Sequence, residues 1–354
     1  MEDLTVLAPP REDAPLAKTL TSSTASQVST FLLGKISDIP DLPDEIDLGS
    51  LRVYAPSQVI FLCGGPTRIT NRPVHPESLR DAFERVRYTG SLSKYQVQLA
   101  EEVVPFYPRG NYRDLLSFES HIAQICEMIL LFSESEGSLC ELGAFAMEPE
   151  IARKMMIVIL RTHYDLDSFI RLGPVQAQIN SYGQQSVYVL DDAGLRISPG
   201  HAEDIDLDTF ARDISDAIKD RLRATVGVVA ASEHTTFNPN RPGHIIKLAV
   251  GIIQHYGSMT SDEVLLILTF MGVTIDAATL GNFLMCAKFV RWVDEDTVGG
   301  RVLFSARKGK KALSYTLRAG SKVLDKDRWL TDVRTHWQAN DRVRFTQLTR
   351  SANR

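Results

Sequence analysis

The segment Met128-Ile-Leu-Leu-Phe132, followed directly by Ser133-Glu-Ser-Glu-Gly-Ser-Leu-Cys-Glu141, decides the fold of this chain. Its first five residues are apolar and predict a buried strand. The polar residues after them predict a loop, Ser133–Ser138, and a helix that begins near Leu139. A strand without polar alternation is buried on both faces, as in a parallel sheet covered by helices. The segment therefore predicts one strand–loop–helix unit of such a sheet.

The same alternation of strands and helices continues on both sides of this segment. A strand at Gln58–Cys63 runs into a tight turn at Gly64-Gly65. Further strands are predicted at Val103–Tyr107, Lys154–Leu160 and Ser186–Leu190, and helices at His75–Arg87, Leu116–Cys126 and Asp204–Arg223. This alternation indicates an α/β fold with a mainly parallel sheet, whose ligands bind at the carboxyl ends of the strands.

The residues after about 243 follow a different pattern, in which three helices precede a hairpin. The helices are predicted at Gly243–Tyr256, from a capping box at Thr260-Ser-Asp-Glu263 to Met271, and from Asp276 to Phe289. Short strands at Arg291–Asp294 and Val302–Ala306 flank Gly299-Gly300, and Tyr315–Leu317 is a further short strand. Three helices followed by a β-ribbon predict an α+β, winged-helix-like domain.

These patterns divide the 354 residues into five segments. They are an acidic, partly disordered N-terminal extension at 1–50, the sheet domain at 51–230, a linker at 231–242, the winged-helix-like domain at 243–320 and a basic tail at 321–354. Residues 1–50 contain nine acidic and three basic residues, whereas 301–354 contain four acidic and fourteen basic ones. The asymmetry predicts a polyanion or an acidic protein surface as the partner of the C-terminal end.

The composition also excludes several classes of protein. The four cysteines form no Cys-x-x-Cys pair and have no His at zinc-ligand spacing, which predicts a reduced cytoplasmic protein without a structural metal. The acidic start of the chain has no apolar signal core. The most apolar runs are far shorter than the roughly 20 residues that span a bilayer, so no membrane association is expected.

Glu141 is the best candidate for a catalytic residue. A carboxylate in the first turn of the helix would project over the crevice at the strand end, where it could attack or stabilise an anomeric carbon. Gly137 allows close approach of the backbone, and the hydroxyls of Ser135 and Ser138 make a plausible cradle for phosphate or sugar oxygens. The alternative is that Glu141 only complements the helix dipole. Glu134 and Glu136 are interpreted as solvated loop charges.

Four segments, in this order and spacing, resemble one known family. They are Ile60-Phe-Leu-Cys-Gly-Gly65, Phe106-Tyr-Pro108 with Asp114-Leu-Leu after it, Ser135-Glu-Gly-Ser-Leu-Cys-Glu-Leu-Gly-Ala-Phe145 and Leu172-Gly-Pro-Val175. They look like the nucleoside deoxyribosyltransferase-like effectors encoded beside bacterial retron reverse transcriptases. The resemblance is strong over residues 58–180. In the C-terminal part it is limited to the architecture, because those effectors also carry a winged-helix-like domain.

The resemblance implies a Rossmann-like fold and cleavage of an N-glycosidic bond, with Glu141 matching the catalytic glutamate. Cys63, Gly64 and Gly65 match the loop against the ligand, and Tyr107 and Asp114 match a segment of base-recognition and polar contacts. A purely structural role remains an alternative for each. The glycines would form a tight turn, Tyr107 would belong to the core, and Asp114 would cap a helix. The resemblance also implies a toxin held inactive by the reverse transcriptase and its branched RNA–DNA product, msDNA, and self-association into homo-oligomers or filaments.

The leaving group helps to choose the substrate. In NAD the nicotinamide is a cationic pyridinium that leaves as a neutral molecule without a proton donor, so one carboxylate in a dry pocket is sufficient. A neutral nucleoside base needs a proton, which Asp114 or Glu119 would have to supply; Glu119 could equally face solvent. The sequence has no Gly-x-Gly-x-x-Gly, so NAD is expected as a substrate and no cofactor is expected. These points favour hydrolysis of NAD to nicotinamide and ADP-ribose.

The basic run Arg307-Lys-Gly-Lys-Lys311 follows the predicted hairpin. Its members Arg307, Lys308, Lys310 and Lys311 are predicted to contact nucleic-acid phosphates, and a solvated loop is the alternative. The third predicted helix carries little positive charge, so reading of a specific operator is not expected. Three other hypotheses remain. They are a nucleotide-sensing winged-helix regulator that binds DNA, a (deoxy)ribosyltransferase that acts on free nucleosides or nucleotides, and a purely structural binding subunit of a nucleoprotein assembly.

Overall fold

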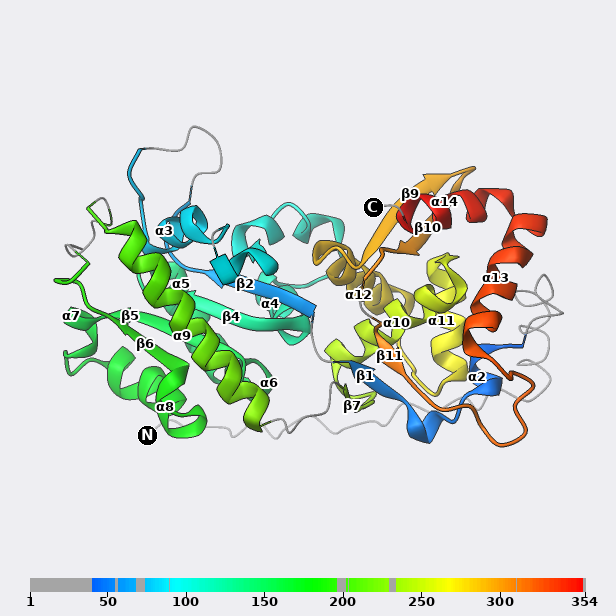
Figure 1. Cartoon of the computed structure of the whole chain (residues 1–354), viewed down its shortest axis with the longest axis horizontal. Helices are drawn as coiled ribbons and strands as arrows, with labels where there is room; N and C mark the ends of the chain where they lie inside the picture. Colours follow the sequence, from blue (N-terminus) through cyan, green and yellow to red (C-terminus); the bar gives the residue numbers. More distant parts are fainter. Residues whose placement is uncertain are drawn as a thin grey trace, which may run out of the picture. The chain divides into compact units, whose positions relative to one another are not determined.

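The structure is a computed structural model of the chain, and it describes residues 40–54, 57–67, 74–88, 90–195, 202, 204–228, 234–309 and 311–352. The predicted N-terminal extension before residue 40 lies outside the described residues. A five-stranded sheet dominates residues 57–228, which we call the sheet domain (Figure 1). Residues 40–54 and 234–352 form further helices and two small sheets, and we call them the C-terminal part.

All neighbouring strands of the large sheet are parallel, which confirms the predicted α/β fold. The order is β3-β2-β4-β5-β6. The strands are β2 (Ser57–Cys63), β3 (Gln96–Leu99), β4 (Cys126–Phe132), β5 (Met155–Leu160) and β6 (Val187–Leu190). The chain passes from β2 to the edge strand β3 and then returns to the other side of β2, so the strand order reverses between β2 and β4. In sheets of this kind, ligands bind at such a reversal, beyond the carboxyl ends of the two strands.

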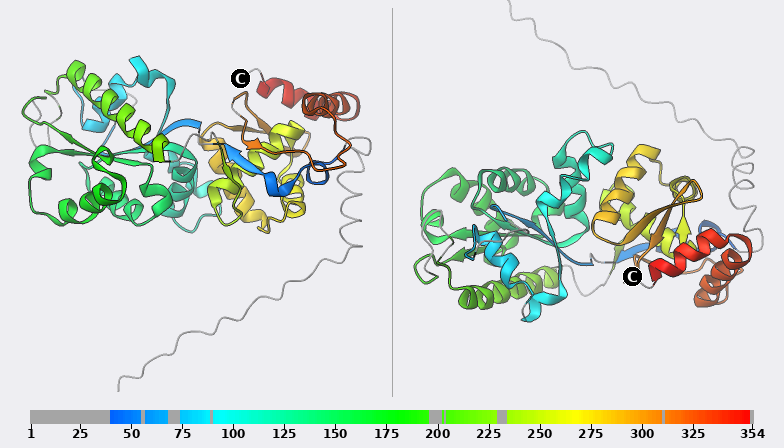
Figure 2. Two further views of the ribbon diagram at one scale, coloured as in Figure 1. Left: turned by 60° about the horizontal axis from the view of Figure 1, so that its bottom comes forward. Right: turned by 90° about the horizontal axis from the view of Figure 1, so that it is seen from above.

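Helices cover both faces of this sheet (Figures 1 and 2). On one face, α3 (Leu79–Val86) and α9 (Leu207–Val228) pack with alternate side chains of the strands into a single apolar cluster. On the other lie α4 (Leu115–Ile125), α5 (Glu136–Ala146) and α8 (Gln176–Tyr182). Shorter turns connect them: η2 (Gly90–Lys94), η3 (Ala100–Val103), η4 (Tyr107–Arg109), α6 (Pro149–Ala152), α7 (Arg161–Tyr164), η5 (Arg171–Val175) and η6 (Gln184–Ser186).

The structure corrects the prediction of a strand at Val103–Tyr107. The edge strand is β3, and the predicted segment instead runs from the end of η3 through a turn to the start of η4. Pro105 and Pro108 lack the backbone N–H that a strand donates to its neighbour, so this apolar segment cannot pair along its length.

The C-terminal part contains the three predicted helices and the predicted hairpin. The elements run α10 (Pro242–Tyr256), β8 (Ser258–Met259), α11 (Ser261–Phe270), α12 (Ala277–Phe289), β9 (Val293–Val298) and β10 (Arg301–Ala306). The predicted caps are confirmed, because Thr260 and Glu263 form a capping box and Asp276 accepts from the backbone N–H of Thr279. Strand β10 pairs with both β9 and β8, which gives a small antiparallel sheet in the order β8-β10-β9.

A second small sheet joins residues that are far apart in the sequence. The strand β1 (Arg52–Tyr54) lies between β11 (Leu313–Ser314) and β7 (His234–Thr236) and is antiparallel to both. The strand predicted at Tyr315–Leu317 is therefore displaced to β11, and only Leu317 forms an isolated bridge, with Ile46. Residues 40–54, which also contain α2 (Leu42–Glu45) and η1 (Leu48–Ser50), thus belong to the C-terminal part.

Polar contacts fix α2 against this part of the molecule. The backbone N–H of Leu42 donates to the hydroxyl of Tyr256 at 3.0 Å, and the indole N–H of Trp329 donates to Pro40 O at 3.0 Å. The buried carboxylate of Glu45 accepts from Ser321 Oγ at 2.7 Å and from the backbone N–H of Lys322 at 2.6 Å. These contacts satisfy polar groups that burial would otherwise leave without partners.

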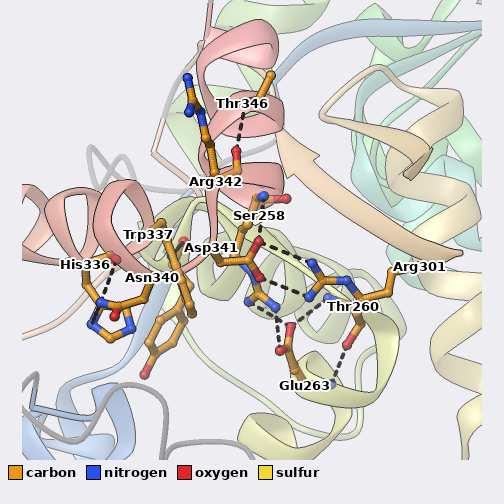
Figure 3. A network of polar contacts seen from close by, with 12 residues as sticks. Ser258, Thr260, Glu263, Arg301, His336, Trp337, Asn340, Asp341, Arg342 and Thr346 are labelled. Atoms are coloured by element: carbon orange, nitrogen blue, oxygen red, sulfur yellow. Dashed lines mark hydrogen bonds and ion pairs between the residues drawn. The ribbon is translucent and has the colours of Figure 1, made fainter. Parts of the chain in front are cut away.

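Residues 321–352 form two helices, α13 (Lys326–Asn340) and α14 (Arg342–Ala352). Figure 3 shows the ion-pair network that connects them to α11 and the hairpin. The guanidinium of Arg344 donates to both carboxylate oxygens of Glu263, at 3.0 and 2.7 Å, and that of Arg301 donates to both of Asp341, at 3.0 and 3.2 Å. Two bidentate pairs of this kind fix geometry as well as adding energy. None of the described helices is long and apolar enough to cross a bilayer.

Candidate functional site

The loops after β2 and β4 meet at the point where the strand order reverses. Leu131 of β4 lies beside Cys63 of β2 in register. Beyond the strand ends, Ser135 Oγ donates to Gly64 O at 3.1 Å. The sequence placed both loops at the carboxyl edge of the sheet, and the structure brings them into contact there.

Glu134 holds these loops together, so its interpretation as a solvated charge was wrong. Its carboxylate accepts hydrogen bonds from three backbone N–H groups, those of Gly65 at 2.9 Å, Leu79 at 2.7 Å and Arg80 at 3.0 Å. Leu79 and Arg80 open α3, so the carboxylate also meets the positive end of that helix. Burial raises the pKa of Glu134, and the backbone N–H groups oppose the rise.

Helix α5 begins at Glu136, one turn earlier than predicted, because Ser135 is its N-cap. The hydroxyls of Ser135 and Ser138 lie 3.1 Å apart, and Ser138 Oγ accepts from the backbone N–H of Ser135 at 3.0 Å. Both hydroxyls thus serve the cap, and Ser138 is buried. By contrast, a Cβ on Gly137 would meet no atom within 4 Å, so the first turn of α5 is open at that position.

Glu141 lies in the second turn of α5 and turns its carboxylate toward the end of β2. The thiol of Cys63, which is fully buried, donates a hydrogen bond to this carboxylate. One carboxylate oxygen of Glu141 is buried and has no hydrogen-bond partner among the described residues. Burial raises the pKa of Glu141, while the Cys63 hydrogen bond and the charge of Arg80 oppose that rise. The carboxylate is therefore partly removed from water and has unused acceptor capacity.

A second carboxyl group, that of Glu119, belongs to the same cluster. It comes from α4 and is only 7% exposed, so it does not face solvent. Burial raises the pKa of Glu119 to about 8, and the negative charge of Glu141 adds to the rise. Burial thus raises the pKa values of both acids. With a pKa of about 8, Glu119 can carry a proton at neutral pH and act as a proton donor beside Glu141.

Arg80 provides the positive charge of the cluster. It is 1% exposed, and its guanidinium forms an ion pair with Glu101, with Nη1 to Oε2 at 2.7 Å. Its Cβ and Cδ lie about 3 Å from the position that a Cβ on Gly64 would occupy, so glycine is required there. The charge of Arg80 acts on both Glu134 and Glu141.

Tyr107 and Asp114 are engaged in their own connection between β3 and α4. Asp114 is the N-cap of α4 and accepts from the backbone N–H of Ser117 at 2.6 Å, which lowers its pKa. The hydroxyl of Tyr107 donates to Arg113 O at 3.0 Å. No contact of either side chain with Glu141 is recorded among the described residues. The structure thus shows Asp114 as a helix cap, which was one of the two roles considered from the sequence.

In the predicted nucleic-acid loop, Arg307 forms an ion pair with Asp294 at 2.6 Å, whereas Lys308 and Lys311 are exposed. Lys310 lies outside the described residues. Among the described residues, no three His, Cys, Asp or Glu side chains are grouped so that they could hold a metal ion.

Sequence reasoning missed Arg80 and Glu134 and left Glu119 undecided. One signal for Glu134 was its place directly after a buried strand, where a carboxylate can reach the start of the neighbouring helix. Arg80 carries no such signal, because its role arises from packing over Gly64.

The comparisons with known proteins agree with the retron resemblance. The profile of the family described as "STM3845 retron effector protein" matches residues 76–295. The chain is also 29% identical over 137 residues to the Escherichia coli protein named "Retron Ec86 putative ribosyltransferase/DNA-binding protein", which covers 36% of this chain and 39% of that protein. It is 35% identical over 142 residues to "Retron Ec73 putative ribosyltransferase/DNA-binding protein" of Escherichia coli, covering 39% and 44%.

Both alignments span less than half the length of these curated relatives. The family profile, however, covers more than half of this chain, including α3, α4, α5 and the helices α10 to α12. The protein therefore belongs to the STM3845 retron effector family.

Proposed function

We propose that this effector cleaves an N-glycosidic bond, with the Glu141 carboxylate acting on the anomeric carbon. The observation that carries the proposal is the buried carboxylate oxygen of Glu141 without a hydrogen-bond partner, at the reversal point of a parallel sheet. A desolvated carboxylate interacts more strongly with the positive charge that develops on the sugar than a hydrated one does. The names of the two relatives, which include ribosyltransferase, support the same class of chemistry.

The surrounding residues have separate tasks in this mechanism. Arg80 and the Cys63 thiol favour the ionised form of Glu141 against the effect of burial. The bond between the anomeric carbon and the base nitrogen breaks, the base leaves with the bonding electrons, and Glu141 either bonds to the anomeric carbon or stabilises its charge. Water then attacks that carbon, the bond to Glu141 breaks if one has formed and releases the carboxylate, and the water proton passes to solvent.

NAD is the substrate we propose first. Its nicotinamide leaves as a neutral molecule from a cationic pyridinium, so no proton donor is needed, and the products are nicotinamide and ADP-ribose. Glu119 supports a second substrate class, neutral nucleosides or nucleotides, because a group with a pKa of about 8 can protonate a leaving base at neutral pH. The two substrates therefore make different demands on Glu119.

We further propose that the chain is a toxin in an anti-phage retron, restrained by the reverse transcriptase and msDNA. In support, α4, which carries Glu119, packs against α12 of the C-terminal part. The segment before α4 also contacts α12, since Asn111 N donates to Asn282 Oδ1 at 2.8 Å and Tyr112 Oη lies 3.1 Å from Cys286 Sγ. Docking of a partner on α12 could thus alter the position of Glu119. The order α10-β8-α11-α12-β9-β10 supports a winged-helix-like unit for that docking.

The test is turnover of NAD by the purified full-length chain and by Glu141→Gln, with released nicotinamide quantified by mass spectrometry. We expect Glu141→Gln to reduce the rate at least about a hundredfold, equivalent to about 2.7 kcal/mol of barrier. Glu148→Gln is the matched control, because Glu148 is exposed beyond the other end of α5. Normal turnover in a Glu141→Gln protein with an unchanged circular dichroism spectrum would refute the catalytic role.

Glu119→Gln separates the two substrate classes. Cleavage of NAD should persist in this variant, whereas cleavage of purine nucleosides should fall at least about a hundredfold. Equal losses on both substrates would show that Glu119 does not act as a proton donor to the leaving base.

A further inference from the structure

A basic cavity lies at the opposite end of the sheet from Glu141. Its volume is about 280 Å³, close to the lower end of the range of roughly 300–1,000 Å³ for small-ligand pockets. The sheet domain contributes Gln58 and Val59 at the start of β2 and Gln96 at the start of β3. Val59 and Cys63 are four positions apart on β2, or about 13 Å of strand. The cavity is therefore separate from the candidate active site.

Positively charged side chains dominate the lining of this cavity. Lys94 comes from the sheet domain, and the C-terminal part adds Lys247, Arg291, Arg307, Lys308 and Lys311. None of the described residues that line it is acidic. Walls of one charge focus the electrostatic field and concentrate ions of the opposite sign.

Two of these cations already have oxygen partners. Arg307 is paired with Asp294, and the buried Lys247 donates to Tyr54 O. Within the described ranges, Lys94, Arg291 and Lys311 have no acidic partner. Bringing such charges together without a counter-charge is unfavourable, so the cavity has unused capacity for an anion.

One further observation at the cavity points to a ligand larger than a simple ion. The indole N–H of Trp292, a lining residue, is buried without a hydrogen-bond acceptor in the described part of the chain. Arg291 beside it has a φ of 58° because it ends α12, where the backbone N–H groups of Arg291 and Trp292 donate to Lys288 O and Ala287 O. The indole donor, the amides of Gln58 and Gln96 and the volume suit a phosphate with a sugar or base attached.

We propose that this cavity binds the phosphate group of a nucleotide, either at the end of a nucleic-acid strand or in a free mononucleotide. The proposal extends the predicted phosphate contacts of Arg307, Lys308 and Lys311 into a defined site, and in that respect it rests on the nucleic-acid role predicted for the loop from the sequence. It does not depend on the chemistry of Glu141. A ligand in the cavity would touch β2 and β3 of the sheet domain and the loops around Trp292 and Lys308 at the same time.

The test compares the binding of two fluorescent thymidine oligonucleotides, one with a 5′-phosphate and one with a 5′-hydroxyl, to the full chain by fluorescence anisotropy. The test variant is Lys94→Gln with Arg291→Gln. The control is Lys219→Gln with Arg223→Gln, which removes the same charge from the exposed side of α9 at residues that do not line the cavity. Unlabelled AMP serves as competitor. Thermal unfolding confirms that both variants are folded.

We expect the phosphorylated strand to bind at least about tenfold more tightly than the hydroxyl strand, and the test variant, but not the control, to lose this preference. Displacement of the phosphorylated strand by AMP, with the same dependence on the two variants, would identify a free nucleotide as the source of the phosphate. Equal binding of both strands without displacement by AMP would overturn the proposal, as would equal effects of the two variants. If the wild-type chain does not bind the hydroxyl strand, this result would instead contradict the general nucleic-acid role of the loop.

Discussion

Replacing Glu119 with Gln should remove a large pH dependence from the stability of the sheet domain. The unfolded chain loses the Glu119 proton near pH 4.5, whereas the folded protein keeps it to about pH 8. Between these values the folded state binds one more proton than the unfolded state, so the free energy of unfolding falls as the pH rises. The interval is about 3.5 pH units at about 1.36 kcal/mol each, so the loss is at most about 5 kcal/mol.

The measurement is urea unfolding at pH 5 and at pH 8.5, followed by circular dichroism, because the three tryptophans all lie in the C-terminal part. At pH 5 Glu119→Gln should be nearly as stable as wild type, since both side chains are neutral. At pH 8.5 it should be more stable by several kcal/mol. Glu148→Gln is the control and should follow wild type. The reasoning fails if Glu119→Gln and wild type lose the same stability between the two pH values.

Three substitutions test the contacts that shape the rest of the structure, each measured by urea unfolding. Glu134→Ala leaves three backbone N–H groups without their acceptor and should cost about 2–4 kcal/mol. Gly64→Ala would place a Cβ 2.9 Å from the Cβ of a buried arginine and should cost about 1–3 kcal/mol. Arg344→Ala leaves the largely buried carboxylate of Glu263 without its bidentate partner and should cost about 3–5 kcal/mol.

Each of these has an outcome that would contradict it. Gly143→Ala is the control for Gly64→Ala, because its Cβ would meet nothing within 4 Å, and it should be neutral or stabilising. A Gly64→Ala protein as stable as Gly143→Ala would show that the strand-end loop can move away. Unchanged stability of Glu134→Ala would mean that water replaces the carboxylate, and unchanged stability of Arg344→Ala would mean that Glu263 takes up a proton.

The parallel sheet was predictable because its central strands consist of consecutive apolar residues. The edge strand was not, since Gln96-Val-Gln-Leu99 is half polar, while the Pro-interrupted segment that follows is more apolar. An edge strand has only one neighbour, so burial selects its sequence less strongly. The sequence pattern therefore favoured the wrong segment.

The residues of the candidate site were also predictable only in part. Glu141 and the Gly64-Gly65 turn could be found because strand ends of a parallel sheet meet at one edge. Glu119 and Arg80 could not be assigned from local patterns, since their roles depend on tertiary contacts with residues 22 and 61 positions away, at Glu141. A buried acid on an amphipathic helix looks the same in sequence as an exposed one.

The pairing of Arg52 with Ser314 places residues from near the two ends of the described chain side by side in one small sheet. During synthesis, the strands β2 to β6 emerge from the ribosome long before β11, so the sheet domain can form while β1 still lacks its neighbour. A chain cut after residue 228 would keep every strand of the large sheet and the Glu141 cluster, but would leave β1 without β7 and β11. Dissecting this protein therefore requires joining 40–54 to 234–352, because a single cut anywhere between them divides the C-terminal part.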